Sequence, residues 1–223
     1  YEINAQGEVV HYSPYNGEVL PGYMFTDTGF WDTFRAVHPL FTLLYPEVSE
    51  RVTQSILNAY DESGFMPEWA SPGHRECMIG NNSISLLTDA WMKGIRTICP
   101  EKALEAMIHQ TEARHPGISS VGRDGFGYYD RLGYVPYPEV HEATAKTLEY
   151  AYADWCVARF ADSIGRKEIA DTYYRKALNY RNLYYPDYGF MWAKDANGKW
   201  RDAFDSTEWG GPFTEGSSWH WTW

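Results

Sequence analysis

Residues 144–164 read TAKTLEYAYADWCVARFADSI, and this stretch decides the predicted fold. Its large apolar and alanine positions recur at three- and four-residue steps, which is the spacing of one helix face. These positions are Leu148, Tyr152, Trp155, Ala158 and Ala161. Thr144 is of the type that caps a helix N-terminus, and Gly165 is of the type that ends a helix. We therefore expect a long helix that is buried on one broad face.

Glu149 lies one turn into this helix, between Leu148 and Tyr150, in a stretch with few charges. Burial in apolar surroundings disfavours the charged form of a carboxylic acid and raises its pKa. Glu149 is therefore our candidate for a group that donates a proton near neutral pH. The alternative is an exposed glutamate, which the helix dipole favours near a helix N-terminus.

Apolar spacing predicts six helices in all, with the start of a seventh near the C-terminus. The six cover residues 30–37, 47–63, 82–93, 100–114, 144–164 and 166–183. Proline at His38-Pro39 is expected to break the first of them. Helix pairs alternate with long aromatic loops, as they do in a ring of paired helices. We predict an all-α fold, a partial (α/α)6 toroid that contains about half of the helical hairpins.

The connecting segments carry further expectations. The long loop 115–143 contains GRDGFGYYDRLGYVPYPEV, and structureless loops of such length are commonly functional. Residues 188–204 predict a small β-hairpin with its turn at Asn197-Gly198. Residues 1–26 form a lead-in of extended segments and turns. Because the chain starts at Tyr1 and stops at Trp223 among aromatic residues, we expect residues 1–223 to be one portion of a larger domain.

Composition narrows the class of partner. The 223 residues include 10 Trp, 18 Tyr and 10 Phe, which makes the chain 17% aromatic. Aromatic faces beside hydrogen-bonding groups suit sugars, although most of these rings are expected to serve the core. The net charge of −11 argues against nucleic acid and anionic membrane surfaces as partners. No apolar run reaches membrane-spanning length, so we expect no membrane insertion.

Polar residues near aromatic rings are the candidate ligands for a sugar. Asp32 and Arg35 lie beside Trp31 on one helical turn, where they form either a grip on sugar hydroxyls or a structural ion pair. Glu68 and Trp69 are neighbours in a loop, although a charged loop residue is usually only solvated. Glu215 lies among aromatic residues at a predicted helix start.

Metal and nucleotide motifs are not found. His220 has no second ligand at metal spacing, so aromatic packing is the better interpretation. The three cysteines (Cys77, Cys99 and Cys156) show neither disulfide nor zinc spacing. There is no GxSxG, HExxH or phosphate-binding glycine loop. A helical scaffold with acids among aromatic rings suits glycoside hydrolysis, which needs two carboxyl groups, or sugar binding without catalysis.

Five blocks of sequence resemble one known family. They are WDTFRAVHPL (31–40), GFMPEW (64–69), MIGNNS…DAWMKG (78–94), TLEYAYADW (147–155) and WGGPFTEGSSWHWTW (209–223). In this order they are similar to the calcium-dependent exo-α-mannosidases of glycoside hydrolase family 92. The resemblance implies that residues 1–223 are the N-terminal portion of an (α/α)6 catalytic domain. It also implies inverting hydrolysis of terminal α-linked mannose on N-glycans or mannans.

The resemblance assigns roles to individual residues. Glu149 matches the general acid of the family's TLEYA-type motif. Trp31, Asp32 and Arg35 are implied to hold the terminal mannose. Two residues of the GFMPEW block, Glu68 and Trp69, are implied to line the same pocket, and Glu215 is implied to contact the leaving-group sugar.

The chain also departs from the family pattern. Thr214 stands where members that prefer α-1,2 linkages have His, and His220 replaces a more frequent Gln. The family's general base is an Asp of an NEPDH-type motif, which does not occur in this sequence. An inverting enzyme needs that second carboxylate roughly 6.5–9.5 Å from the first. We therefore expect the isolated chain to be inactive, with the base and most Ca2+ ligands supplied from elsewhere.

Two alternatives stay open. One is a non-catalytic mannan-binding protein, and the other is an (α/α)6 glycosidase of the trehalase or glucosidase type. The family resemblance further implies a periplasmic or secreted enzyme whose partner is a mannose-containing glycan.

Overall fold

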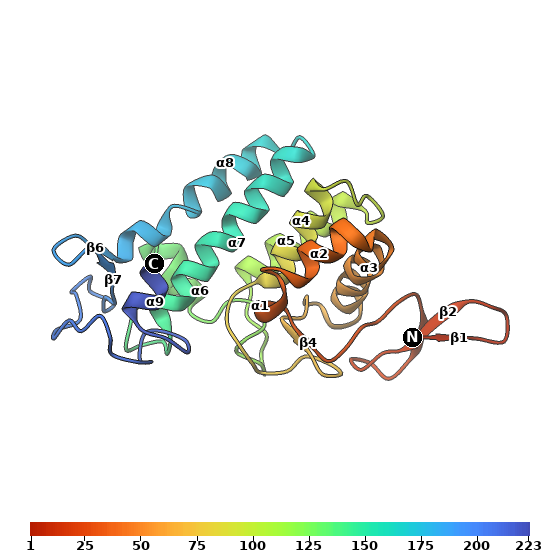
Figure 1. Cartoon of the computed structure of the whole chain (residues 1–223), viewed down its shortest axis with the longest axis horizontal. Coiled ribbons are helices and arrows are strands. Elements are labelled where there is room, and N and C mark those ends of the chain that lie inside the picture. The colour runs from red at the N-terminus through yellow and green to blue at the C-terminus, as the bar shows by residue number, and fades with distance from the viewer.

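A computed structural model describes residues 1–223, and the chain is mostly helical, as predicted. The helices are α1 (Phe30–Thr33), α2 (Val37–Leu44), α3 (Pro46–Ser63), α4 (Asn82–Met92), α5 (Pro100–Glu112), α6 (Phe126–Leu132), α7 (Ala143–Ser163), α8 (Lys167–Lys176) and α9 (Ser218–Thr222). A short 3-10 helix covers Asn179–Leu183. Helix α7 lies in the middle of the molecule, between the end that carries α1–α5 and the end that carries α9 (Figure 1).

Seven short strands form three small antiparallel sheets. The strands are β1 (Glu2–Ile3), β2 (Val9–Tyr12), β3 (Val19–Pro21), β4 (Thr28–Gly29), β5 (Trp69–Ala70), β6 (Tyr184–Tyr185) and β7 (Phe190–Met191). The sheet order is β1-β2-β3, β4-β5 and β6-β7. The first sheet forms the expected lead-in and projects from one end of the molecule (Figure 1). The pairing of β4 with β5 matters most for the candidate site, because it joins the segment before α1 to the loop after α3.

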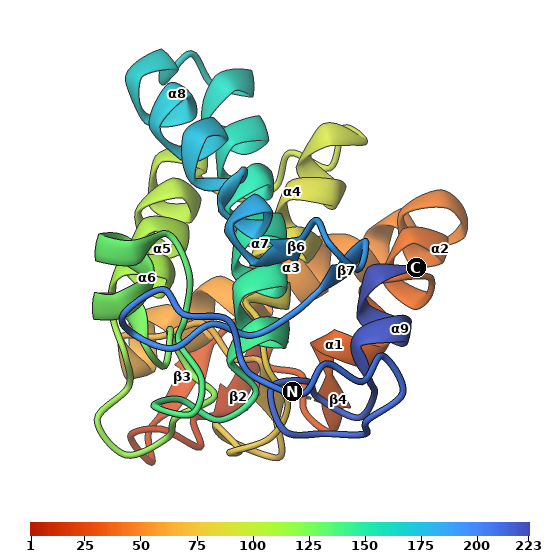
Figure 2. The same ribbon diagram turned by 90° about the vertical axis from the view of Figure 1, so that its left-hand side faces the viewer.

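The main apolar core gathers around α7, which packs against α4, α5 and α8. Figure 2 shows α7 with α8 on one side and α4 on another. The predicted inward residues of α4, which are Ile84, Leu87 and Trp91, are buried as expected. Full burial of a side chain such as Phe160 stabilises the fold by roughly 1.5–3 kcal/mol.

The predicted buried face of α7 is wrong in its large residues. Tyr152 is 40% exposed and Trp155 is 46% exposed, and their rings stack against each other on the outer side. Alanines such as Ala158 and Ala161 are fully buried, as predicted. Neighbouring helices approach α7 closely where its side chains are small, so the large aromatic residues are left outside.

The start of α7 also differs from the prediction. The helix begins at Ala143, and Thr144 lies buried in the first turn, where its hydroxyl makes no hydrogen bond. The N–H groups of Thr144 and Ala145 donate instead to the carbonyl of Pro212, at 3.0 and 3.1 Å. A loop carbonyl thus satisfies the helix N-terminus that a side chain was expected to cap. The predicted stop at Gly165 is confirmed, with φ at 79°.

Three helix boundaries need correction. The first helix ends at Thr33, and Pro39 lies inside the first turn of α2, where its missing N–H costs nothing. The helix predicted over 166–183 divides into α8 and the 3-10 helix. The loop 115–143 contains α6, which has only seven residues and gives little periodic signal.

The predicted hairpin is confirmed only in part. Paired strands β6 and β7 precede the predicted turn, and the segment around Asn197-Gly198 forms a single bridge between Lys194 and Trp200. None of the helices is both long and apolar enough to cross a membrane.

Candidate active site

The predicted acid Glu149 lies on α7, on the face that is turned toward α1. It is 8% exposed, and its Oε1 accepts a hydrogen bond from the indole Nε1–H of Trp31 at 3.1 Å. Burial raises the pKa of Glu149 to about 7, while the charge of Arg35 and the Trp31 hydrogen bond lower it by less. A carboxyl group in this state can hold a proton near neutral pH and release it to a substrate.

Trp31 lies in the first turn of α1, and Arg35 follows the end of this short helix. The Arg35 guanidinium carbon lies 4.4 Å from the centroid of the Trp31 ring and 4.5 Å from that of Phe34. Arg35 and Asp32 form no ion pair, so the structural alternative for this pair is not observed. The guanidinium therefore keeps its hydrogen-bond donors available while its charge acts on Glu149.

Asp32 and Trp69 meet at Gly29, one residue before α1. A side chain at Gly29 would lie 2.5 Å from the Trp69 ring and 2.9 Å from an Asp32 carboxylate oxygen. Gly29 pairs with Trp69 in the β4–β5 sheet, which explains the close approach. The fold thus brings an aromatic ring and a carboxylate from different segments to one place beside Trp31.

Glu68 is buried and is bonded entirely within the chain. Its Oε2 accepts from the backbone N–H groups of Asn82 (2.7 Å) and Ser83 (3.2 Å). Its Oε1 accepts from the Ser83 hydroxyl (2.9 Å) and from the Gln110 amide (3.0 Å). Burial raises the pKa of Glu68 to about 8, although these four donors favour the ionised form. Glu68 therefore caps α4, and its contact with a sugar stays a prediction.

A buried network ties the segment before α4 to α7. Arg123 and Asp154 are 1% and 0% exposed in their side chains and lie 2.8 Å apart. Arg123 Nε donates to Asn81 Oδ1 at 2.8 Å, and Arg123 Nη2 donates to the Tyr150 carbonyl at 3.1 Å. The Tyr129 hydroxyl donates to Asp154 at 2.7 Å. The network fixes residues 79–82 against the helix that carries Glu149.

Glu215 is exposed, with its backbone in the left-handed region at φ 44°. It follows Pro212, whose carbonyl binds the first turn of α7, so the loop that carries Glu215 runs past the N-terminal end of that helix. His220, five residues later in the sequence, accepts at Nδ1 from the backbone N–H of Ser217 at 3.2 Å. It also packs edge-on against Trp209, in keeping with the predicted aromatic role.

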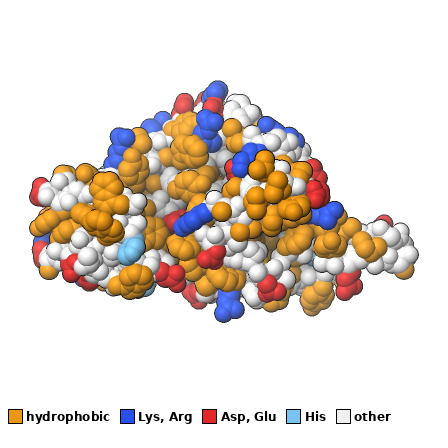
Figure 3. All heavy atoms as spheres, in the orientation of Figure 1, with side chains coloured by type: hydrophobic (Ala, Val, Ile, Leu, Met, Phe, Trp, Pro, Cys, Tyr) orange, Lys and Arg blue, Asp and Glu red, His pale blue; other side chains and the backbone are white.

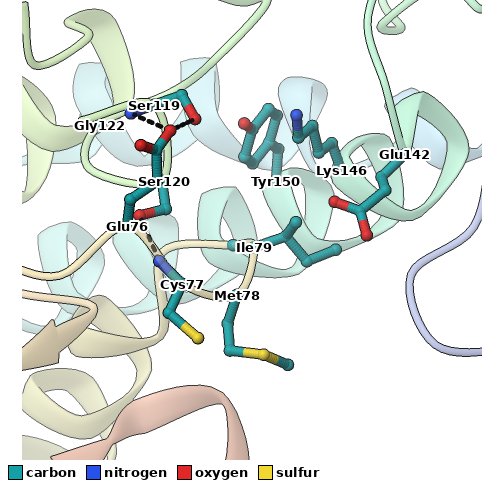
Figure 4. A pocket seen from close by; sticks show the side chains of 11 residues that line it. Glu76, Cys77, Met78, Ile79, Ser119, Ser120, Gly122, Glu142, Lys146 and Tyr150 are labelled. Atoms are coloured by element: carbon teal, nitrogen blue, oxygen red, sulfur yellow. Dashed lines mark hydrogen bonds between the residues drawn. The ribbon is translucent and has the colours of Figure 1, made fainter. Parts of the chain in front are cut away.

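The surface between the two ends of the molecule is hollowed on the face shown in Figure 3. A cavity of about 170 Å³ is lined by residues 76–80, by Ser119 and Ser120, and by residues at the start of α7. Figure 4 shows Lys146 and Tyr150 from α7 on one side of this cavity, with Glu76 and Ser119 across from them. Lys146 is held by an ion pair with Asp124 at 2.9 Å. Glu149 does not line this cavity.

These observations define a class of protein. A buried acid with a raised pKa that accepts from an indole N–H, with an arginine over that same ring, suits a glycoside hydrolase. The sequence model of the glycosyl hydrolase family 92 catalytic domain matches residues 1–223. The chain therefore belongs to glycoside hydrolase family 92, which confirms the resemblance seen in the sequence.

Solved structures of this family are similar to the chain. An inverting mannosidase of family GH92 from Bacteroides thetaiotaomicron VPI-5482 is 80% identical over the whole chain, with a TM-score of 0.99. An α-mannosidase of the same family and species, in complex with mannoimidazole, is 32% identical over 93% of the chain, with a TM-score of 0.84. The chain spans 30% and 28% of the lengths of these two proteins.

A curated relative is more distant. It is described as an uncharacterized secreted glycosidase of Arthroderma benhamiae, and it is 26% identical over 65% of this chain. The chain spans 21% of the length of that protein.

Several contacts around Glu149 were not predicted. Arg123 and Asp124 appear in the sequence only as a charged pair within a glycine-rich loop. Their partners Asp154 and Lys146 are distant in the sequence, so nothing local identifies them. Gly80 belongs to the MIGNNS block, yet its closeness to Glu149 depends on the packing of two elements.

Proposed function

We propose that residues 1–223 form part of an inverting exo-α-mannosidase, as the N-terminal portion of an (α/α)6 catalytic domain. The helix pairs around α7 and the high similarity to a family GH92 inverting mannosidase support this proposal. The substrate class is a glycan with terminal α-linked mannose, such as an N-glycan or a mannan.

Glu149 is the general acid. The observation that carries this assignment is the buried carboxyl group, which accepts the Trp31 N–H at 3.1 Å and has a pKa of about 7. In the reaction Glu149 gives its proton to the glycosidic oxygen as the bond from that oxygen to the mannose C1 breaks. A general acid of this kind accelerates the reaction by about 10²–10⁴-fold.

The residues around Glu149 bind the mannose. Trp31 and Trp69 offer ring faces, and Asp32 and Arg35 offer an acceptor and donors for sugar hydroxyls. Glu215 contacts the leaving-group sugar from the loop that caps α7. Glu68 stabilises the wall of the pocket, because its carboxylate fixes the start of α4.

The second carboxylate and the Ca2+ ion come from outside these residues. No group of three His, Cys, Asp or Glu side chains in the chain could hold a metal, so its residues do not by themselves fit a calcium site. We place most Ca2+ ligands and the base that activates water in the remainder of the whole protein. Removal of Ca2+ by a chelator should abolish mannose release by the whole protein, and added Ca2+ should restore it.

The decisive variant is Glu149→Gln in the whole protein. An enzyme would lose release of mannose from an α-mannosyl disaccharide and would keep mannoside binding, measured by calorimetry. A mannan-binding protein would show no turnover in either form. Rates of hydrolysis of matched aryl α-mannosides and α-glucosides distinguish a mannosidase from a glucosidase with the same toroidal fold.

We propose that the whole protein acts in the periplasm or outside the cell. The fungal relative described as secreted supports this placement, as does the nature of the substrate. Detection of mannosidase activity only in cytoplasmic fractions would contradict it.

A further inference from the structure

Gly80 lies directly against the carboxyl group of Glu149. Its φ is +91°, and a Cβ atom built there would lie 2.9 Å from Glu149 Oε2 and 3.2 Å from Glu149 Cβ. The same Cβ would lie 2.8 Å from Asn82 Nδ2. Carbon and oxygen atoms do not approach this closely without a shift, so only glycine leaves Glu149 in its observed place.

The two oxygens of Glu149 have different surroundings. Oε1 accepts the Trp31 N–H. Oε2 faces Gly80, has no hydrogen-bond partner in the chain and is not fully enclosed. A proton on the carboxyl group therefore belongs on Oε2, because an oxygen that already accepts a hydrogen bond is less basic.

The Gly80 backbone is held in place by buried contacts. Asn81 accepts from Arg123 Nε at 2.8 Å and donates through Nδ2 to the Gly122 carbonyl at 3.1 Å. Arg123 in turn bonds the Tyr150 carbonyl at 3.1 Å, and Tyr150 is the next residue after Glu149. The acid and the backbone opposite it are thus fixed to the same buried arginine.

We propose that Gly80 is a positioning residue for Glu149: its missing side chain keeps open the space in which Oε2 carries its proton and delivers it to the glycosidic oxygen. The proposal rests on the proposed role of Glu149 as general acid. The atoms that a methyl group at Gly80 would meet are mainly the far ends of two side chains. These ends can rotate away from the added methyl group, and the carboxyl group of Glu149 then no longer points in its observed direction.

The test compares Gly80→Ala with Gly94→Ala in the whole protein. Gly94 has φ +94° and nothing within 4 Å of a built Cβ, so it carries the same backbone strain without the contact. Each variant is assayed on an α-mannosyl disaccharide, whose leaving group needs a proton, and on 2,4-dinitrophenyl α-mannoside, whose leaving group does not.

Gly80→Ala should lower kcat on the disaccharide by about 10–100-fold, within the range that a general acid supplies, and should leave the dinitrophenyl substrate nearly unaffected. Gly94→Ala should match the wild type on both substrates. An equal loss on both substrates for Gly80→Ala, or no loss on the disaccharide, would overturn the proposal.

Two further variants complete the design. Asn81→Ala removes the hydrogen bonds that hold the Gly80 backbone and adds no atoms. It tests the role of Gly80 if Gly80→Ala does not fold. It should lower kcat on the disaccharide by a smaller factor with the same dependence on leaving group, and a substrate-independent change would count against the proposal. Glu149→Gln reports on the acid itself. If Glu149→Gln leaves disaccharide hydrolysis intact, the proposed function fails. If Glu149→Gln abolishes disaccharide hydrolysis but Gly80→Ala does not lower it, only the role proposed for Gly80 is rejected.

Discussion

At the scale of single residues, the site depends on a carboxyl group that is costly to ionise. Glu149 is 8% exposed, and its compensating contacts are one indole N–H and the charge of Arg35. Neither compensates fully for the lost water, so the pKa rises to about 7. On the proposed role of Glu149, the same burial that keeps a proton available for transfer destabilises the folded protein wherever the acid is ionised.

Glu149→Gln should therefore stabilise the whole protein at alkaline pH. A carboxyl group whose folded-state pKa is raised contributes stability that is complete below about 4.5 and is lost as the pH rises through about 7. At pH 8 the variant should exceed the wild type by about 1–3 kcal/mol, and at pH 4.5 the difference should vanish. Thermal unfolding at both pH values measures this. Glu18→Gln, at an exposed position, is the control, and a variant that is less stable at pH 8 would contradict the expectation.

Trp31→Phe should move the pH dependence of activity. The variant keeps the aromatic ring and removes the N–H that favours ionised Glu149, so the pKa of the acid should rise by up to about one unit. Because the reaction needs the protonated form, the alkaline limb of the kcat/KM profile should shift to higher pH. Trp155→Phe, on the outer side of α7, should leave the profile in place. An alkaline limb that stays in place, or that shifts to lower pH, would contradict stabilisation of ionised Glu149 by the indole N–H.

At the scale of elements, the sequence predicted the helices better than it predicted their buried faces. Periodic apolar residues located α3, α4, α5 and α7 within a few residues. The face of α7 was not predictable in this way, because alanines surround the helix and neighbours approach it from several sides. The seven-residue α6 was missed because so short a helix shows less than two turns of periodicity.

The candidate site was likewise predicted only in part from the sequence. Motif residues of α1 and α7 do meet, as Trp31 and Glu149 demonstrate. The buried pair of Arg123 and Asp154 was not foreseen, since its members lie 31 residues apart and their contact depends on how the loop folds onto α7. Long-range polar contacts of this kind leave no local pattern in a single sequence.

Asp154→Asn tests how much this pair stabilises the joined elements. The variant leaves the Arg123 charge buried without its partner, which should cost about 3–5 kcal/mol. The matched control is Asp89→Asn, which breaks an exposed ion pair with Lys93 and should cost less than about 1 kcal/mol. The midpoint of urea unfolding of the whole protein measures both. Equal losses of stability would mean that the buried pair stabilises the packing of residues 79–82 against α7 no more than an exposed ion pair would.

At the scale of the whole molecule, the chain exposes apolar surface that a folded domain would cover. Leu43 is 76% exposed and Leu44 is 56% exposed on α2, and the Tyr152–Trp155 stack lies open on α7. Exposed apolar groups of this extent mark contact surfaces in soluble proteins. The chain spans 30% of a family GH92 mannosidase that is 80% identical to it, and on the function proposed above further parts of the whole protein cover these side chains.

The isolated chain should accordingly show neither full stability nor turnover. Glu149 can donate a proton, but inverting hydrolysis also needs a carboxylate across the sugar to activate water, and we place that group outside residues 1–223. Residues 1–223 expressed alone should release no mannose from an α-mannosyl disaccharide, with or without added Ca2+, while the whole protein does. They should also bind a hydrophobic dye that the whole protein does not bind, because α2 and α7 lack their cover. Clear mannose release by the isolated chain would mean that one of its own carboxylates acts as the base, and Asp32, which meets Trp69 at Gly29, would then be the first residue to replace.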